Sequence, residues 1–161
     1  MDIEQIKKAD TKIIGKNILY YDKIESTQQE AKKRVKELID GTIIVAENQT
    51  KGIGTKGRTW YTNTHTNITM TIVLYPNCNI IKLEGLTTKI AQAMQETIKD
   101  LYGILLQLKE PNDLLLNDKK IGGILTESAT YQNKVTHLLI GIGFNVNETN
   151  FASEIEQIAT S

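Results

Sequence analysis

Residues 138–147 read LLIGIGFNVN, and the alternation within this stretch decides the expected fold. In an extended strand, successive side chains point to opposite faces of a sheet. One face here is apolar, with Ile142, Phe144 and Val146. The other face holds two glycines followed by two amides, which are Gly141, Gly143, Asn145 and Asn147. The stretch predicts a strand with one face in a core and one bare face, which either a tightly packed helix or a ligand approaches closely.

Other segments supply the partners of this strand, which we expect over 135–147. Short apolar and β-branched runs predict further strands, and Pro76 stops one of them. Asn117-Asp118 predicts a turn between two others. The predicted strands are 17–24, 42–47, 67–74, 104–109, 113–117 and 120–126.

Two segments have helical spacing. Ser26 and Thr27 are candidate caps for a helix whose apolar positions recur until Gly41. The second helix is expected from Lys82 to Tyr102 and is followed by a glycine. Residues 1–12 and 151–161 are candidates for short helices. The order of elements predicts an α+β fold with a mixed, mainly antiparallel sheet and helices packed on one side.

The bulk composition restricts the class of protein. A chain of 161 residues with 40% hydrophobic content has the size of one domain, so we expect residues 1–161 to form a single unit. Its 19 basic and 19 acidic residues cancel, which argues against a nucleic-acid or membrane partner. The lone cysteine, Cys78, rules out an internal disulfide and fits a cytoplasmic location. His65 and His137 lack metal-ligand spacing, so no metal-binding residue is predicted.

Residues 46–60, AENQTKGIGTKGRTW, combine glycines with basic residues and hold the only tryptophan. This composition predicts a loop that wraps an anion, and the alternative is a flexible surface connection with incidental charges. Lys109 ends a strand in KEPND, where it is either a functional cation or a solvated lysine. Ser26 and Thr27 are plain helix caps, ligand contacts, or both.

These blocks in this order resemble the catalytic domain of biotin protein ligases. The resemblance runs from about Tyr20 to the end of the chain. It rests on the Ser-Thr pair at 26–27 and on ENQTKGIGTKGRTW, KEPNDLLLNDKKIGGILTE and IGIGFNVN. It implies a fold like that of class II aminoacyl-tRNA synthetases and biotin synthetase, and an enzyme that activates biotin to biotinyl-5′-AMP with ATP and Mg²⁺. The activated biotin would pass to a lysine of a biotin carboxyl carrier domain, and the sequence leaves homodimer formation open.

The resemblance also implies site residues. It assigns the catalytic role to Lys109 and Arg58. Expected biotin contacts are Ser26, Thr27, Gln49, Gly52, Ile53, Lys109, Leu114, Gly141 and Gly143. Expected nucleotide contacts are Thr55, Lys56, Arg58, Trp60, Lys109 and Asn145. The loop would close over the adenylate, because water destroys a mixed anhydride.

The sequence departs from the family pattern at three positions. The usual loop carries arginines where Ile53 and Thr55 stand, and the usual KWPND has tryptophan where Glu110 stands. A threonine cannot replace a guanidinium. Residues 1–19 are too short for the DNA-binding domain of some members, so we expect none. Most members continue into a small carboxy-terminal domain, and because this chain ends at Ser161 we expect that domain to be absent through truncation.

Two alternatives stay open at this point. A lipoate or octanoate ligase shares the fold and the adenylation chemistry, although the ENQT and KEPND blocks argue against it. A non-catalytic module that binds biotin or a carrier protein is the second, and the loop substitutions favour it.

Overall fold

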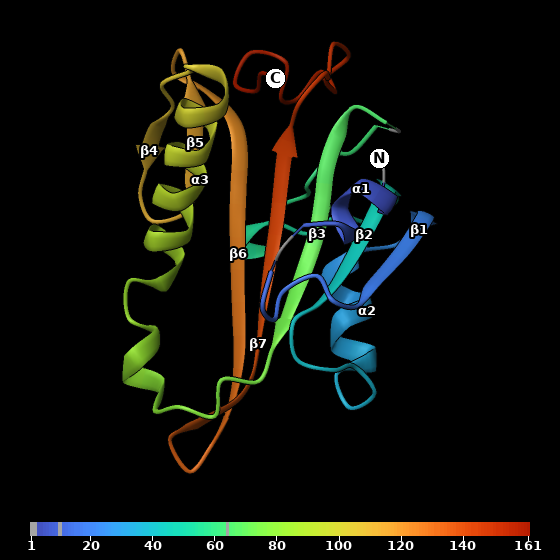
Figure 1. Ribbon diagram of the computed structural model, residues 1–161. Coiled ribbons are helices and arrows are strands. Elements are labelled where there is room, and N and C mark those ends of the chain that lie inside the picture. Colours follow the sequence, from blue (N-terminus) through green and yellow to red (C-terminus); the bar gives the residue numbers. More distant parts are fainter. Residues whose placement is uncertain (1–2, 10, 64) are drawn as a thin grey trace.

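One seven-stranded sheet organises the molecule (Figure 1). The computed structural model describes residues 3–9, 11–63 and 65–161. The strand order across the sheet is β1-β2-β3-β7-β6-β5-β4. Only β1 and β2 run parallel among the described strands, and every other neighbouring pair is antiparallel. The strands are β1 (Ile18–Ile24), β2 (Thr42–Gln49), β3 (Asn67–Leu74), β4 (Gln107–Lys109), β5 (Asp113–Leu116), β6 (Lys119–Tyr131) and β7 (Lys134–Asn145). The expected mixed, mainly antiparallel sheet is confirmed.

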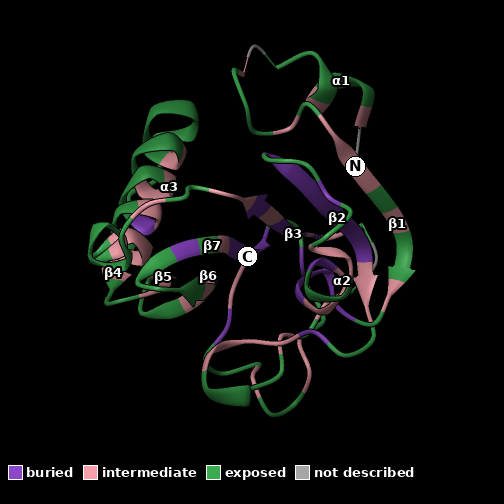
Figure 2. Cartoon of the chain, turned by 90° about the horizontal axis from the view of Figure 1, so that it is seen from below, coloured by how far each residue is buried: buried purple, intermediate pink, exposed green. Residues whose placement is uncertain are grey.

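The two longest helices lie on opposite faces of this sheet, as the view from below shows (Figure 2). Helix α2 (Thr27–Arg34) packs with Val73 and Leu139, whereas α3 (Leu86–Tyr102) packs with Ile140 and Ile142. Residues 139 and 140 are neighbours in a strand and therefore point to opposite faces. The expectation that the helices share one side is corrected for this reason. Each face carries its own apolar cluster, and each cluster needs its own cover.

The apolar core lies between the sheet and α3. Alternate residues of β7 point into it, and helix α3 contributes Ala91, which is fully buried. Leu114 and Ile124 extend it across β5 and β6. The face predicted from Ile142 and Phe144 is therefore confirmed as core, whereas the prediction for Val146 is wrong, because this residue follows the end of β7 and is 44% exposed.

Several element ends differ from the sequence expectation. Helix α2 ends at Arg34, before Gly41, and the Val35 carbonyl accepts a hydrogen bond from the Tyr75 hydroxyl. The segment from Lys82 divides into a 3₁₀ helix, η2 (Ile80–Leu83), and α3, because Gly85 takes a left-handed φ of 70° between them. The end of α3 at Gly103, with φ 69°, is confirmed.

The hairpins explain other differences. The turn at Asn117-Asp118 is confirmed, with φ of 51° and 65°. Strand β6 runs on to Tyr131, five residues past the expected end, because a second turn of positive φ at Gln132-Asn133 extends the hairpin with β7.

The chain ends are less regular than the strands. Helix α1 covers Ile3–Lys7, and residues 1, 2 and 10 of the expected amino-terminal helix lie outside the described part. The expected helix over 151–161 is wrong, because this segment forms turns and its Ala159 bridges Lys120 of β6. Among the described helices, none has the length and hydrophobicity needed to cross a membrane.

Candidate functional site

The polar face of the sheet lies opposite the α3 core. Thr71 pairs with Gly141, Thr69 with Gly143, and Asn67 with Asn145 across β3 and β7. The expected bare face is therefore real, and two side chains approach it. A Cβ added at Gly141 would lie 2.8 Å from Gln28 Oε1 of α2, and one at Gly143 would lie 2.3 Å from Trp60 Cε2. A helix thus approaches the first glycine and the glycine-rich loop approaches the second.

A network of hydroxyl and amide groups fixes the start of α2 on this face. The Ser26 hydroxyl accepts from the Gln29 N–H at 3.4 Å, so Ser26 is a helix cap as expected. Gln49 Oε1 accepts from the Thr27 N–H at 2.8 Å and from its hydroxyl at 3.1 Å. The Thr71 hydroxyl lies 3.0 Å from Thr27 Oγ1. Ser26, Thr27 and Thr71 are all buried. Their polar groups therefore present a fixed pattern of donors and acceptors.

The network continues through residues that sequence reasoning missed. Gln28 donates to Glu127 Oε2 at 2.7 Å, and Lys32 donates to Glu127 Oε1 at 2.7 Å. Burial by itself raises the pKa of the Glu127 carboxyl, but the hydrogen bonds from Lys32 and Gln28 outweigh it and leave the pKa lowered. These contacts join α2 to β6, a partner 99 residues away from Gln28 in the chain. The capping pattern predicted the helix, but nothing local in the sequence indicated this partner.

The glycine-rich loop folds back on itself over the sheet. The Trp60 N–H donates to the Gly52 carbonyl at 2.9 Å, and the Gly54 N–H donates to the Arg58 carbonyl at 2.7 Å. A Cβ at Gly52 would lie 2.2 Å from the Trp60 carbonyl oxygen, so this position needs glycine. The loop thereby places the Trp60 indole on the polar face.

Two cavities lie along this face. The smaller has a volume of about 40 Å³ and lies beside the start of α2. Six of the expected biotin contacts line it, which are Ser26, Thr27, Gln49, Ile53, Gly141 and Gly143. The larger has a volume of about 350 Å³, and of the expected nucleotide contacts Thr55, Arg58, Trp60 and Asn145 line it. The structure therefore brings most of the expected residues into two adjacent groups.

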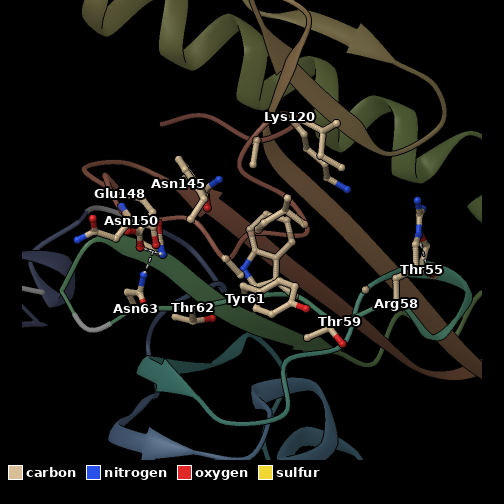
Figure 3. A pocket seen from close by; sticks show the side chains of 18 residues that line it. Thr55, Arg58, Thr59, Tyr61, Thr62, Asn63, Lys120, Asn145, Glu148 and Asn150 are labelled. Carbon is tan, nitrogen blue, oxygen red and sulfur yellow. Dashed lines mark hydrogen bonds between the residues drawn. The ribbon is translucent and has the colours of Figure 1, made fainter.

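Polar and charged side chains such as Asn63, Asn145 and Glu148 line the larger cavity (Figure 3), together with apolar residues. Three buried polar atoms at its wall have no hydrogen-bond partner among the described residues, namely Trp60 Nε1, Thr62 Oγ1 and Asn67 Oδ1. Phe151 and Ile155 of the carboxy-terminal segment line it as well. The Asn145 amide donates to the Thr160 carbonyl at 2.9 Å, which ties this segment to β7. Buried polar atoms without partners are what a ligand with its own donors and acceptors would satisfy.

Glu148 is the buried acid at this cavity. It accepts from the Thr66 hydroxyl at 2.7 Å, the Asn67 amide at 3.2 Å and the Asn150 N–H at 2.9 Å. Burial alone raises the pKa of its carboxyl, but the hydrogen bonds from Asn150, Thr66, Asn63 and Asn67 outweigh burial and hold the pKa below the usual value. Glu148 is therefore ionised at neutral pH and anchors the segment after β7.

Four of the expected contacts lie elsewhere. Lys109 is exposed at the end of β4 and lines neither cavity. Lys56 is also exposed and lines neither. Gly52 also lines neither cavity, and it lets the two ends of the loop approach each other at the Trp60 carbonyl. Leu114 is fully buried in the α3 core, so side-chain packing gives no support to its expected contact with biotin. Lys120, which sequence reasoning did not assign, lines both cavities.

The two cavities lie between the glycine-rich loop and the glycine-bearing strand β7, and this arrangement defines a candidate binding site for a small molecule. Residues 20–145 match the Biotin/lipoate A/B protein ligase family. The chain belongs to that family.

Curated relatives agree with this assignment. The bifunctional ligase/repressor BirA of Bacillus subtilis is 36% identical over 154 residues, which are 94% of this chain and 47% of that protein. The biotin–[acetyl-CoA-carboxylase] ligase of Paracoccus denitrificans is 33% identical over 138 residues, covering 84% of this chain and 57% of that protein. The chain thus spans about half the length of the curated relatives it matches.

A solved structure shares the fold. The biotin protein ligase from Aquifex aeolicus in complex with biotin and ATP superposes with a TM-score of 0.72 at 31% identity, over 90% of this chain and 59% of that one. The expected relation to the biotin synthetase-like fold is confirmed.

Proposed function

We propose that this chain activates biotin with ATP and transfers it to a carrier lysine. The observation that carries the proposal is the pair of adjacent cavities on one sheet face. The smaller is lined by the fixed hydroxyl and amide groups of Ser26, Thr27 and Gln49, which suit a polar, uncharged ring. The larger has unpaired polar atoms, apolar cover and Arg58, which suit a nucleotide. The names of the relatives support the same activity.

The proposed reaction has two steps. A carboxylate oxygen of biotin attacks the α-phosphorus of ATP, and pyrophosphate leaves with the electron pair of the broken bond. The ε-amine of a carrier lysine then attacks the acyl carbon of the anhydride, loses a proton, and releases AMP. The first step brings anions together, so fixed positive donors are the main catalytic need. Arg58 and Lys109 stay the predicted catalytic residues, with Lys109 on the same face as Asp113 and Gly123 in one row across the sheet.

Other components follow from this chemistry. Mg²⁺ binds proteins through few carboxylates and mostly through substrate phosphates. No group of three or more His, Cys, Asp or Glu side chains in the described ranges could hold a metal, so we propose that Mg²⁺ enters on the nucleotide. The macromolecular partner is the carrier domain of a carboxylase, and the single cysteine fits work in the cytoplasm.

The loop has to open for biotin to enter. Ligand pockets usually measure roughly 300–1,000 Å³, whereas the smaller cavity measures about 40 Å³. The side chain that fills the space above Gly143 belongs to Trp60 of the loop. Hydrogen exchange over residues 50–63 and 65–67 is therefore expected to be fast without ligand and slower with biotin and MgATP. Equal exchange with and without ligand would argue against closure of the glycine-rich loop over the ligand.

The deciding assay is ATP–pyrophosphate exchange with biotin, lipoate or octanoate in turn. We expect exchange with biotin. Exchange with lipoate alone would assign the chain to the lipoate branch of the family. Absence of exchange together with biotin binding by calorimetry would favour the non-catalytic module.

A further inference from the structure

The carboxylate of Glu127 lies next to the smaller cavity without lining it. Side chains two positions apart in a strand share a face, so Glu127 follows Leu125 on the α2 side of β6. Leu125 lines the smaller cavity. The buried Gln28 side chain lines it as well and donates to Glu127. Glu127 is therefore placed to act on the cavity through Gln28.

Each oxygen of the Glu127 carboxylate accepts from one donor. Oε2 accepts from Gln28 Nε2 at 2.7 Å, and Oε1 accepts from Lys32 Nζ at 2.7 Å. Burial alone raises the pKa of this carboxyl, but the hydrogen bonds from Lys32 and Gln28 outweigh burial and lower it, so Glu127 is ionised at neutral pH. An ionised carboxylate only accepts hydrogen bonds. Glu127 therefore fixes the Gln28 amide with its NH2 group toward β6 and its oxygen facing away.

The fixed Gln28 oxygen orders the neighbouring hydroxyl groups. The Thr71 hydroxyl lies 3.0 Å from Gln28 Oε1 and 3.0 Å from Thr27 Oγ1. An amide oxygen cannot donate, so the single Thr71 proton goes to Gln28. The Thr27 hydroxyl has two acceptors within reach, Gln49 Oε1 at 3.1 Å and Thr71 Oγ1, and its proton goes to one of them. Both hydroxyl protons are thus used between protein groups.

The lone pairs of Thr27 and Thr71 are what these hydroxyls have left for a ligand. Both residues are buried and line the smaller cavity. Such acceptors favour a ring that carries N–H donors over one that carries only acceptors. Gly141 makes room for the arrangement, because a Cβ there would lie 2.8 Å from Gln28 Oε1. The hydrogen-bond polarity of this wall therefore originates at Glu127, outside the cavity.

We propose that Glu127 is a positioning residue that sets the hydrogen-bond polarity of the smaller cavity through Gln28 and Thr71. This inference rests on the proposed function, in which the ring of biotin brings its N–H groups to this cavity. An isosteric glutamine at position 127 has one oxygen for two donors, so either Lys32 or Gln28 loses its acceptor. A turned Gln28 amide then gives its NH2 group to Thr71. The Thr71 proton is freed to oppose an N–H group of the ligand.

The first test measures ligand binding in Glu127→Gln. Biotin affinity by calorimetry should fall about tenfold, the usual weight of one hydrogen bond. The KM for ATP at saturating biotin should stay at the wild-type value, because neither Gln28 nor Thr71 lines the larger cavity. Glu37→Gln is the matched control and should bind biotin like the wild type, since Glu37 pairs with Arg34 of α2 and lines neither cavity. Unchanged biotin affinity in Glu127→Gln overturns the inference.

The second test exchanges the two side chains in the double variant Gln28→Glu/Glu127→Gln. A glutamate at position 28 only accepts from Thr71, and a glutamine at position 127 can donate to it while its oxygen accepts from Lys32. This exchange restores the polarity of the wall, so the double variant should recover most of the lost biotin affinity. A purely structural role predicts that the second substitution deepens the loss.

Circular dichroism checks the fold of each variant, and where one variant is unfolded the other decides. A deeper loss of biotin affinity in a folded double variant overturns the inference. A wild type that binds no biotin overturns the proposed function itself.

Discussion

The two faces of the central sheet are made by the same strands and differ in the side chains that cover them. On the α3 face, alternate residues such as Ile140 and Ile142 close an apolar core. On the α2 face, the residues between them are glycines and threonines, covered by amides and one indole. Around residues 140–145, period-two alternation therefore assigns stability mainly to the α3 face and chemistry to the α2 face, whose own smaller apolar cluster includes Ala31 and Leu139. Substitutions on the two faces should separate these properties.

The largest effect is expected from Leu114→Ala. Leu114 is fully buried in the α3 core, and truncating such a leucine typically costs about 2–5 kcal/mol of unfolding free energy. Urea unfolding should show this loss, while biotin affinity of the folded protein, measured by calorimetry, stays at the wild-type value. A selective loss of biotin affinity would instead support the direct contact inferred from the family.

The second prediction concerns the opposite face. In Gly143→Ala the new Cβ would lie 2.3 Å from Trp60 Cε2, so the indole and its loop have to move. Misplacement of a binding group by about 1 Å can cost roughly a hundredfold in rate, or about 2.7 kcal/mol. Single-turnover adenylate formation should fall by this factor, with unfolding free energy changed much less. An active Gly143→Ala protein would mean that a close approach to the strand at Gly143 is not needed for catalysis.

Gly122→Ala is the matched change on the α3 face. A Cβ there would lie 2.6 Å from Phe144 Cδ2, which overpacks the core. Overpacking usually costs about 1–3 kcal/mol. We expect a lower melting temperature with adenylate formation per folded molecule near the wild-type rate. If this variant loses activity and keeps its stability, the α3 face does not serve stability alone, and the proposed separation of the two faces is wrong.

Sequence reasoning predicted the sheet and one of its faces better than the site. The alternation of side chains placed Gly141, Gly143 and Asn145 on one face, because alternation is a local property of a strand. It did not assign Lys120, which lies beside a register shift between β5 and β6 that depends on the pairing of two strands. It also failed to place the helices, because a helix can pack on either face and the residues that decide it, such as Gln28 and Glu127, are distant in the chain.

The other site residues were predicted from the resemblance to the family and not from side-chain alternation or composition. Ser26 was expected both to cap a helix and to face a ligand, and it caps α2 while lining the smaller cavity. Lys109 was expected to be central and is exposed at the sheet edge. A motif gives the order of residues along the chain, whereas the position of a side chain across a sheet depends on strand order and curvature.

The smallest effect should come from acidification at the rim of the polar face. The pKa of Glu148 is lowered from 4.5 because hydrogen bonds from Asn150, Thr66, Asn63 and Asn67 outweigh burial. A lowered carboxyl pKa adds stability that is complete above the unfolded value and is lost as pH falls through the folded value. The wild-type unfolding free energy should therefore decline as pH falls below about 4.5.

Other acids contribute to that decline, so the effect of Glu148 has to be isolated by difference. Glu148→Gln should be less stable than wild type at pH 7, where the lost charge-assisted hydrogen bonds matter. The gap should narrow as the pH falls through the lowered pKa and the wild-type carboxyl is protonated. Exposed Glu156→Gln is the control and should show a smaller gap at every pH. Because Thr66 and Asn67 lead into the wall of the larger cavity, the same acidification should weaken nucleotide binding more than biotin binding. Equal weakening of both ligands would show that Glu148 supports the whole face and not the nucleotide end alone.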